Sequence, residues 1–228
     1  MKSKRSVLVT ICTKNPQLCY LLENIDYFRN LLGDRKYLIS IIDSDSNILS
    51  AYKELEKKKK KEEKKYSQVN IHYSKNRHYE YGAYKYSYQM YPNYDIYVCI
   101  QDTVLFTKKI NIKHVSNEQA YIYKHHSGFN LDRQSIPFSM RVLKSSPFPY
   151  PDYANDPSVR TFPMCQHCSF ITTKKNMSGI FETLTIPPSD KLGSRSYERL
   201  FGLYFLFKNI KIINLRQLKV KKVHRKRK

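Results

Sequence analysis

Acidic side chains follow two apolar segments of this sequence, at positions where they could hold a ligand. Asp102 comes just after the run IYVCI at Ile96–Ile100, and Asp43 and Asp45 follow YLISII at Tyr37–Ile42. A carboxylate past a buried strand can bind a divalent cation beside a diphosphate, or accept hydrogen bonds from a ribose. The structural alternatives are that Asp102 caps the next turn and that the Asp43–Asp45 pair caps the following helix.

A second, weaker signal indicates phosphate binding between Asn76 and Gly82. Gly82 permits close approach of the backbone to a ligand, and the amino end of a helix favours phosphate. Lys85, with Arg77 and His78, adds positive charge to this segment.

Glu198 lies in SRSYERLFG, near the expected start of an apolar helix. A carboxylate there could be the general base that deprotonates a sugar hydroxyl. The alternative is an ion pair with Arg195 or Arg199, and Asp190 and Glu182 are rival bases.

The segment Cys165–Cys168 reads CQHC, which has the spacing of half a zinc site. A structural zinc needs four ligands, and the sequence has no second CxxC or HxxxH, so we do not expect zinc here. His167 precedes the apolar run CSFITT and could still line a site.

Alternating strands and helices are expected to position these side chains. Short, apolar, β-branched segments predict buried strands at Val7–Thr13, Tyr37–Ile42, Val69–Tyr73 and Ile96–Ile100. The segments between them favour helices, at Pro16–Leu32, Ile48–Lys65 and Glu80–Met90. Repeated strand–helix–strand units predict an α/β fold with a Rossmann-type, mostly parallel sheet and helices on both faces. Ligands of such sheets bind beyond the carboxyl ends of the strands.

The second half of the chain, residues 111–218, is less periodic and Pro-rich between 137 and 163. A strand is expected within Thr161–Thr173, a helix at Tyr197–Phe207 and a last apolar segment at Ile210–Leu215. We therefore expect one domain over residues 1–218, followed by a basic tail at 219–228.

The net charge of +22, from 41 Lys and Arg against 19 Asp and Glu, favours an anionic partner. Half of the excess lies in the tail and in the Lys/Glu-rich segment Lys53–Lys65. Ten of the twenty Tyr lie between Tyr66 and Tyr97, interleaved with basic residues. They could stack on single-stranded nucleic acid, or pack a helix against the sheet.

The five Cys are irregularly spaced, which favours reduced thiols and a cytoplasmic protein. No apolar run approaches eighteen residues, and the amino-terminal segment reads as a strand rather than a signal peptide. The basic tail could attach the protein peripherally to an anionic membrane surface.

Several of these segments, in their order, resemble the small GT-A glycosyltransferases of bacteria and large viruses. They are VLVTICTKN, YLISIIDSDSN, the N-x5-G-A of Asn76–Ala83 and IYVCIQDTVLF. QHCSFITTKKNM and SYERLFGLYF resemble the later strand and the Glu-Arg helix of such enzymes. The resemblance spans roughly residues 6–207. It implies a GT-A-like domain with a nucleotide-binding half at 1–110 and an acceptor half at 111–218.

The activity that the resemblance implies is transfer of a hexose from a UDP- or GDP-linked sugar to a glycan or protein acceptor. The implied nucleotide-binding residues are Thr10, Cys12, Thr13, Asp43, Asp45, Asn76, Gly82, Lys85, Gln101 and Asp102. Glu198 and Asp190 are the candidate bases, and His167 and Arg195 belong to the acceptor side.

Gln101-Asp102-Thr103 takes the place of the family's metal-binding Asp-x-Asp. Gln101 stands where the first Asp is expected, which leaves one carboxylate, and Mn²⁺ or Mg²⁺ is expected at Asp102.

The competing interpretation is a non-enzymatic, basic nucleic-acid-binding protein. Such a protein would bind oligonucleotides with a steep salt dependence that does not need Asp102.

Overall fold

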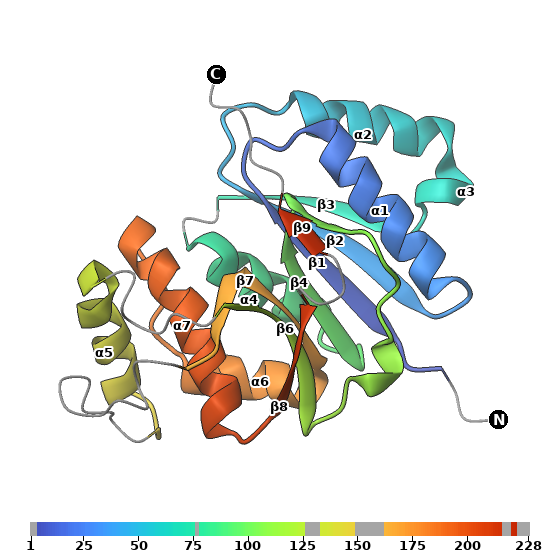
Figure 1. Cartoon of the computed structure of the whole chain (residues 1–228). Coiled ribbons are helices and arrows are strands. Elements are labelled where there is room, and N and C mark those ends of the chain that lie inside the picture. Colours follow the sequence, from blue (N-terminus) through green and yellow to red (C-terminus); the bar gives the residue numbers. More distant parts are fainter. Residues whose placement is uncertain (1–3, 76–77, 126–132, 149–161, 216–219, 223–228) are drawn as a thin grey trace.

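The computed structural model of the chain describes residues 4–75, 78–125, 133–148, 162–215 and 220–222. Its centre is a seven-stranded sheet in the order β3-β2-β1-β4-β7-β6-β8 (Figure 1). The strands are β1 (Val7–Thr13), β2 (Tyr37–Ser44), β3 (Val69–Ser74), β4 (Ile96–Gln101), β6 (Gln119–His125), β7 (Met164–Thr173) and β8 (Lys211–Asn214).

Strands β1 to β4 are parallel, as the strand–helix alternation predicts. Strand β7 runs antiparallel to both of its neighbours, β4 and β6, and β8 is parallel to β6. The expected α/β architecture is therefore confirmed, with a sheet that is mixed and predominantly parallel.

Helix α1 (Leu18–Leu32) shows how the sequence pattern becomes structure. It buries Leu21, Ile25, Phe28 and Leu32 on one stripe against the sheet. Gly33 ends it at φ +56°, a left-handed conformation that glycine adopts without steric cost, and its N–H bonds the Arg29 carbonyl.

Two helices replace the single one expected over Ile48–Lys65. Helix α2 (Ser50–Lys61) buries only Ala51, Tyr52 and Leu55, and α3 (Glu63–Tyr66) follows after a break at Glu62. The Lys and Glu side chains of α2 lie largely in solvent because its apolar stripe is so narrow.

Helices cover both faces of the sheet, and each face has its own apolar core. On one face pack α1 and α2, and on the other pack α4 (Tyr79–Met90), α5 (Ile136–Lys144), α6 (Lys174–Thr183) and α7 (Lys191–Phe207) (Figure 1). Coverage of both faces explains why VLVTICT, buried at every position, is continuously apolar rather than alternating.

The second half contains three elements that the sequence pattern does not predict, namely β6, α5 and α6. Helix α6 includes Ser and Gly, which have low helix propensity, and is held by burial of Met177, Ile180 and Phe181. Helix α7 begins six residues before the expected Tyr197, because Asp190 caps it through the N–H of Gly193 at 2.7 Å.

The basic tail is not wholly separate from the fold. Its residues Val220–Lys222 form β9, which pairs antiparallel with β5 (Val104–Phe106) in a second, two-stranded sheet. Residues 220–222 of the basic tail therefore pair with the fold, while 219 and 223–228 lie outside the described residues.

Helix α7 lies against the chain that enters β7. A Cβ on Gly202 would stand 1.9 Å from the Pro163 carbonyl oxygen, so only glycine permits this contact. The contact fixes the later turns of α7 beside the start of β7. In the described part of the chain, no helix, α7 included, is both long and apolar enough to cross a bilayer.

Candidate functional site

The carboxyl ends of β1, β2, β3 and β4 meet at one edge of the sheet, which we call the carboxyl edge. The strand registers place Thr13 opposite Asp43 and Cys12 opposite Gln101. The Asp102 N–H donates to the Cys12 carbonyl at 3.1 Å, which brings Asp102 directly beside the end of β1. The two acidic segments singled out in the sequence therefore flank the same strand.

This edge includes the point where strand order reverses. From β1 the chain continues to β2 on one side, while β4 lies on the other. The connecting helices leave on opposite faces, and such switch points are where open α/β sheets bind ligands.

Asp43 is a buried carboxylate that organises the loop after β2. Its oxygens accept hydrogen bonds from the Ser46 N–H at 3.2 Å and from the Tyr52 hydroxyl at 2.8 Å. Tyr52 also contacts the Thr13 hydroxyl, so Asp43 ties β1, β2 and α2 together. The alternative that this pair caps the following helix is wrong, because Leu49 stands at the N-cap of α2 without a side-chain hydrogen bond. Asp45 is the exposed acid of the pair.

Asp102 is 3% exposed, and its own backbone is fixed on both sides. Its N–H bonds Cys12, and its carbonyl accepts from the buried Asn24 amide of α1 at 2.9 Å. The position of Asp102 is thus set by β1 and α1 together.

Glu80, in the first turn of α4, is a site residue that the sequence reading missed. Its carboxylate accepts hydrogen bonds from the Gln101 amide and, at 3.1 Å, from the Ser194 hydroxyl of α7. It therefore joins the end of β4 to the start of α7. The available signal was an acid in the first turn of a helix that follows a parallel strand.

Cys12 lies at the centre of these acids. Burial raises the pKa of its thiol well above the ordinary value, and three nearby carboxylates raise it further: Glu80, Asp102 and Asp43. The thiol is therefore neutral and unsuited to act as a nucleophile. Burial also raises the pKa of the Cys168 thiol, and the nearby carboxylates of Glu80 and Glu198 raise it further.

Glu198 and His167 meet at the far end of the same edge, where β7 begins. The Glu198 carboxylate accepts a hydrogen bond from the backbone N–H of His167 at 2.9 Å. The same carboxylate lies 3.8 Å from Nδ1 of the His167 ring. Both side chains are partly exposed, 23% and 20%. Of the rival bases, Asp190 caps α7, and Glu182 lies exposed on α6 with a hydrogen bond from Ser178. Arg195, expected on the acceptor side, lies exposed on α7.

Thr10 does not lie at the carboxyl edge. It is buried in the middle of β1, and its hydroxyl donates to Ser87 of α4 at 2.8 Å. The expectation that Thr10 lines a nucleoside pocket is therefore not supported, since β1 reaches the edge only at Cys12 and Thr13.

Gly82 and Lys85 line a separate hollow of about 440 Å³ beside the carboxyl edge. The other lining residues are Ser74, Lys75, His78, Tyr81, Tyr86, Gln89 and Pro187. Asn76, the first residue of the predicted phosphate segment, lies outside the described residues.

Backbone strain gathers at the carboxyl edge. Among the described residues, six that are not glycine have positive φ, and five of them lie at this edge: Asn15 and Asp45 in loops, Tyr79 at the start of α4, and His167 and Cys168 within β7. Left-handed conformations cost of order 1–3 kcal/mol each and recur at ligand-binding sites.

The described residues contain no group of three or more His, Cys, Asp or Glu side chains placed to hold a metal ion. At the end of β4 the protein offers the Asp102 carboxylate, while Gln101 is bonded to Glu80. These side chains do not fit a metal held by protein ligands alone.

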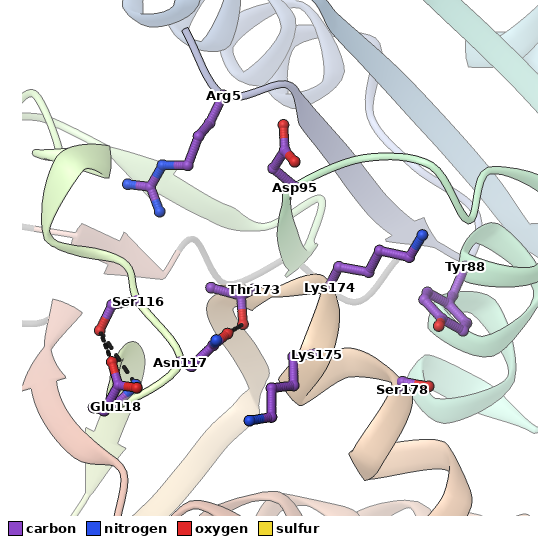
Figure 2. A pocket seen from close by; sticks show the side chains of 10 residues that line it. All are labelled: Arg5, Tyr88, Asp95, Ser116, Asn117, Glu118, Thr173, Lys174, Lys175 and Ser178. Atoms are coloured by element: carbon purple, nitrogen blue, oxygen red, sulfur yellow. Dashed lines mark hydrogen bonds between the residues drawn. The ribbon is translucent and has the colours of Figure 1, made fainter. Parts of the chain in front are cut away.

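The opposite, amino edge of the sheet carries a larger hollow of about 620 Å³ (Figure 2). It is lined by Arg5, Tyr88, Asp95, Ser116, Asn117, Glu118, Thr173, Lys174, Lys175 and Ser178. Many of its polar groups are bonded to each other, as the dashed contacts of Thr173 with Asn117 and of Ser116 with Glu118 show.

Comparison with known proteins does not extend this description: no protein-family model matches the chain, and no curated protein does.

Proposed function

We propose that this chain is a glycosyltransferase with a GT-A-like domain, which moves a hexose from a UDP- or GDP-linked sugar to a glycan or protein hydroxyl. The observation that carries the proposal is the convergence of Asp43, Glu80 and Asp102 on the end of β1 at the switch point of the sheet. Polar and acidic groups at that point suit the ribose and diphosphate of a nucleotide.

The arrangement of the second half supports the same proposal. Strand β7 enters the sheet antiparallel, so that its first residues, and not its last, lie at the carboxyl edge. This brings His167 and, through α7, Glu198 to the same edge, where Glu198 and Glu80 both lie near the Cys168 thiol. A donor site and a candidate base thereby share one edge.

The proposed chemistry is a displacement at the anomeric carbon of the donor sugar. An acceptor hydroxyl loses its proton to the Glu198 carboxylate and forms the new glycosidic bond. The bond from the anomeric carbon to the diphosphate breaks, and the diphosphate leaves with the electron pair. Lys14, directly after β1, supplies positive charge near the leaving group.

Mn²⁺ or Mg²⁺ remains part of the proposal. Asp102 is the residue that would hold it, and the oxygens of the diphosphate would complete its ligands. When bound, the ion would neutralise charge on the diphosphate.

Burial of the tyrosines argues against the nucleic-acid-binding alternative. Of the ten tyrosines between Tyr66 and Tyr97, only Tyr73 is exposed, at 49%. The others pack at least partly against the fold, so they do not form an open platform for stacking bases.

Titration calorimetry of UDP and GDP, with and without Mn²⁺, tests the proposal. We expect one nucleotide to bind and Asp102→Asn to weaken it about tenfold, since a charged interaction is lost. Asp34→Asn is the matched control, because Asp34 is exposed and pairs with Lys4 at the amino edge. Absence of nucleotide binding, or equal effects of the two variants, would refute the proposal.

A further inference from the structure

The hollow beside α4 concentrates positive charge. Among the described residues its lining includes Lys75 and Lys85, with His78 beside them, and no Asp or Glu. Neither lysine forms a salt bridge within these residues. Two ammonium groups in a concave site are suited to an anionic ligand.

Lys85 and His78 are each held in position by a neighbouring group. The Lys85 ammonium lies 5.7 Å from the centre of the Tyr81 ring, a cation–π contact. His78 bonds the Pro188 carbonyl at 2.8 Å through Nδ1, which must therefore carry the hydrogen. The site is thus built from three elements: the end of β3, the helix α4 and the loop before α7.

The remaining lining is of the kind that binds a sugar ring. Tyr86 is partly exposed and provides aromatic surface, whereas Tyr81 is buried beneath Lys85, and Gln89 and Ser74 provide hydrogen-bonding groups. The volume of about 440 Å³ falls within the range of small-molecule sites. An aromatic wall with amide, hydroxyl and ammonium groups fits a saccharide that carries negative charge.

Ser74 connects this hollow to the carboxyl edge. It lines the hollow, and its hydroxyl donates to the Asp43 carbonyl at 2.7 Å. A ligand in the hollow would therefore be a close neighbour of a ligand at the switch point. The hollow itself includes no residue of β1, β2 or β4.

We infer that the hollow, which we call the α4 hollow, binds an anionic hexose unit, a sugar bearing a phosphate or a carboxylate. The assignment of this unit to the acceptor rests on the proposed transferase function. The anion site itself does not depend on that function. The negative group would bind the lysines, and the ring would lie against the tyrosine surface.

Calorimetric titration with glucose-6-phosphate, glucuronate, glucose and inorganic phosphate tests this inference. We expect at least one anionic sugar to bind about tenfold or more tightly than glucose and than inorganic phosphate. Binding of phosphate alone as tightly as of either sugar, or equal binding of glucose, would overturn the inference. The two anionic sugars distinguish a phosphate from a carboxylate ligand.

Charge variants then locate the site. The variant K75Q/K85Q should lose about tenfold in affinity for the anionic sugar, while K75R/K85R should retain it. K53Q/K61Q removes the same charge from exposed positions of α2 and should change nothing. Equal losses in the α2 control, or no loss in K75Q/K85Q, would overturn the assignment.

Nucleotide titration of the single variant K75Q separates this inference from the proposed function. UDP or GDP affinity should be unchanged in K75Q, which leaves Lys85 in place, and weakened in Asp102→Asn. If K75Q weakens nucleotide as much as sugar, Lys75 serves the donor diphosphate and the inference is wrong. If no nucleotide binds but the anionic sugar does, the proposed function fails and the anion site stands.

Discussion

The two edges of the sheet differ in how their polar groups are satisfied. The amino edge has the larger hollow, yet the Arg5, Asp95 and Glu118 side chains in its lining are bonded within the protein. Arg5 donates to the carbonyls of Val115, Ile112 and Lys113, and the Asp95 carboxylate accepts from Ser6. The α4 hollow at the carboxyl edge is smaller, and its lysines have no salt bridge within the described residues.

The two edges also differ in backbone strain, which is concentrated at the carboxyl edge. The carboxyl edge holds five non-glycine residues at positive φ, whereas Asn209, the sixth among the described residues, precedes β8 at the amino edge. Strained backbone persists only where the surrounding structure holds it. The comparison teaches that backbone strain, rather than the volume of the hollow, distinguishes the candidate site in this molecule.

The sharpest test of the comparison removes the candidate base. Glu198→Gln keeps the acceptor for the His167 N–H but cannot take a proton, so transfer should slow about a hundredfold or more. The assay is release of UDP or GDP from the cognate nucleotide sugar. Glu182→Gln on α6, an exposed acid bonded by Ser178, should leave the rate unchanged. Equal losses in the two variants would remove Glu198 from the mechanism.

A substitution at the amino edge should affect folding and not binding. Arg5→Met removes charged hydrogen bonds to three carbonyls and should lower the free energy of unfolding by about 2 kcal/mol. Lys4→Met breaks only the exposed pair with Asp34 and should cost less than about 1 kcal/mol. Urea unfolding measures both. Weaker nucleotide binding in Arg5→Met would contradict the division of roles between the edges.

The strained residues can be compared directly. Asp45 has φ +59° and Asn209 has φ +51°, and glycine adopts both conformations freely. Asp45→Gly and Asn209→Gly should each change stability by less than about 1 kcal/mol. Only Asp45→Gly should weaken nucleotide binding, by about fivefold, as expected for loss of one hydrogen bond. Calorimetry with the nucleotide checks this, and an equal effect of Asn209→Gly would mean that strain relief alone alters the site.

The smallest expected effect concerns pH. Hydrogen bonds from the Ser6 hydroxyl and N–H lower the pKa of Asp95 below its ordinary value. A carboxyl with a lowered pKa in the folded state stabilises the fold above its unfolded pKa of about 4 and loses this contribution as pH falls through the folded value. Asp95→Asn should therefore flatten the stability profile on the acid side, measured by urea midpoints between about pH 5 and pH 3. An unchanged profile would show that Asp95 contributes nothing there.

Much of the first half was predictable from the sequence because its signals are local. Continuous apolar runs such as VLVTICT mark strands covered on both faces, and Gly33 marks the end of α1. The second half was harder to predict. Helix α6 has weak propensity, and β7 runs against the direction of its neighbours, which residue spacing does not reveal.

Parts of the site were predictable for the same reason. Asp102 and Asp45 follow their strands directly, so a parallel sheet places both at the carboxyl edge. Glu80 was missed because its importance depends on Gln101 and Ser194, which are distant in sequence. Thr10 was misplaced because the register, and not the strand's composition, decides which residue reaches the edge.

The sequence by itself determined the strand–helix alternation, the positive charge and the presence of acids after two strands. All three depend on residue type and short-range spacing. Only the tertiary structure decided that Asp43 is a structural anchor, that Glu80 joins β4 to α7 and that Lys75 and Lys85 share one hollow. Those facts depend on which segments meet across the sheet, and contacts between distant segments are set by packing of the whole chain.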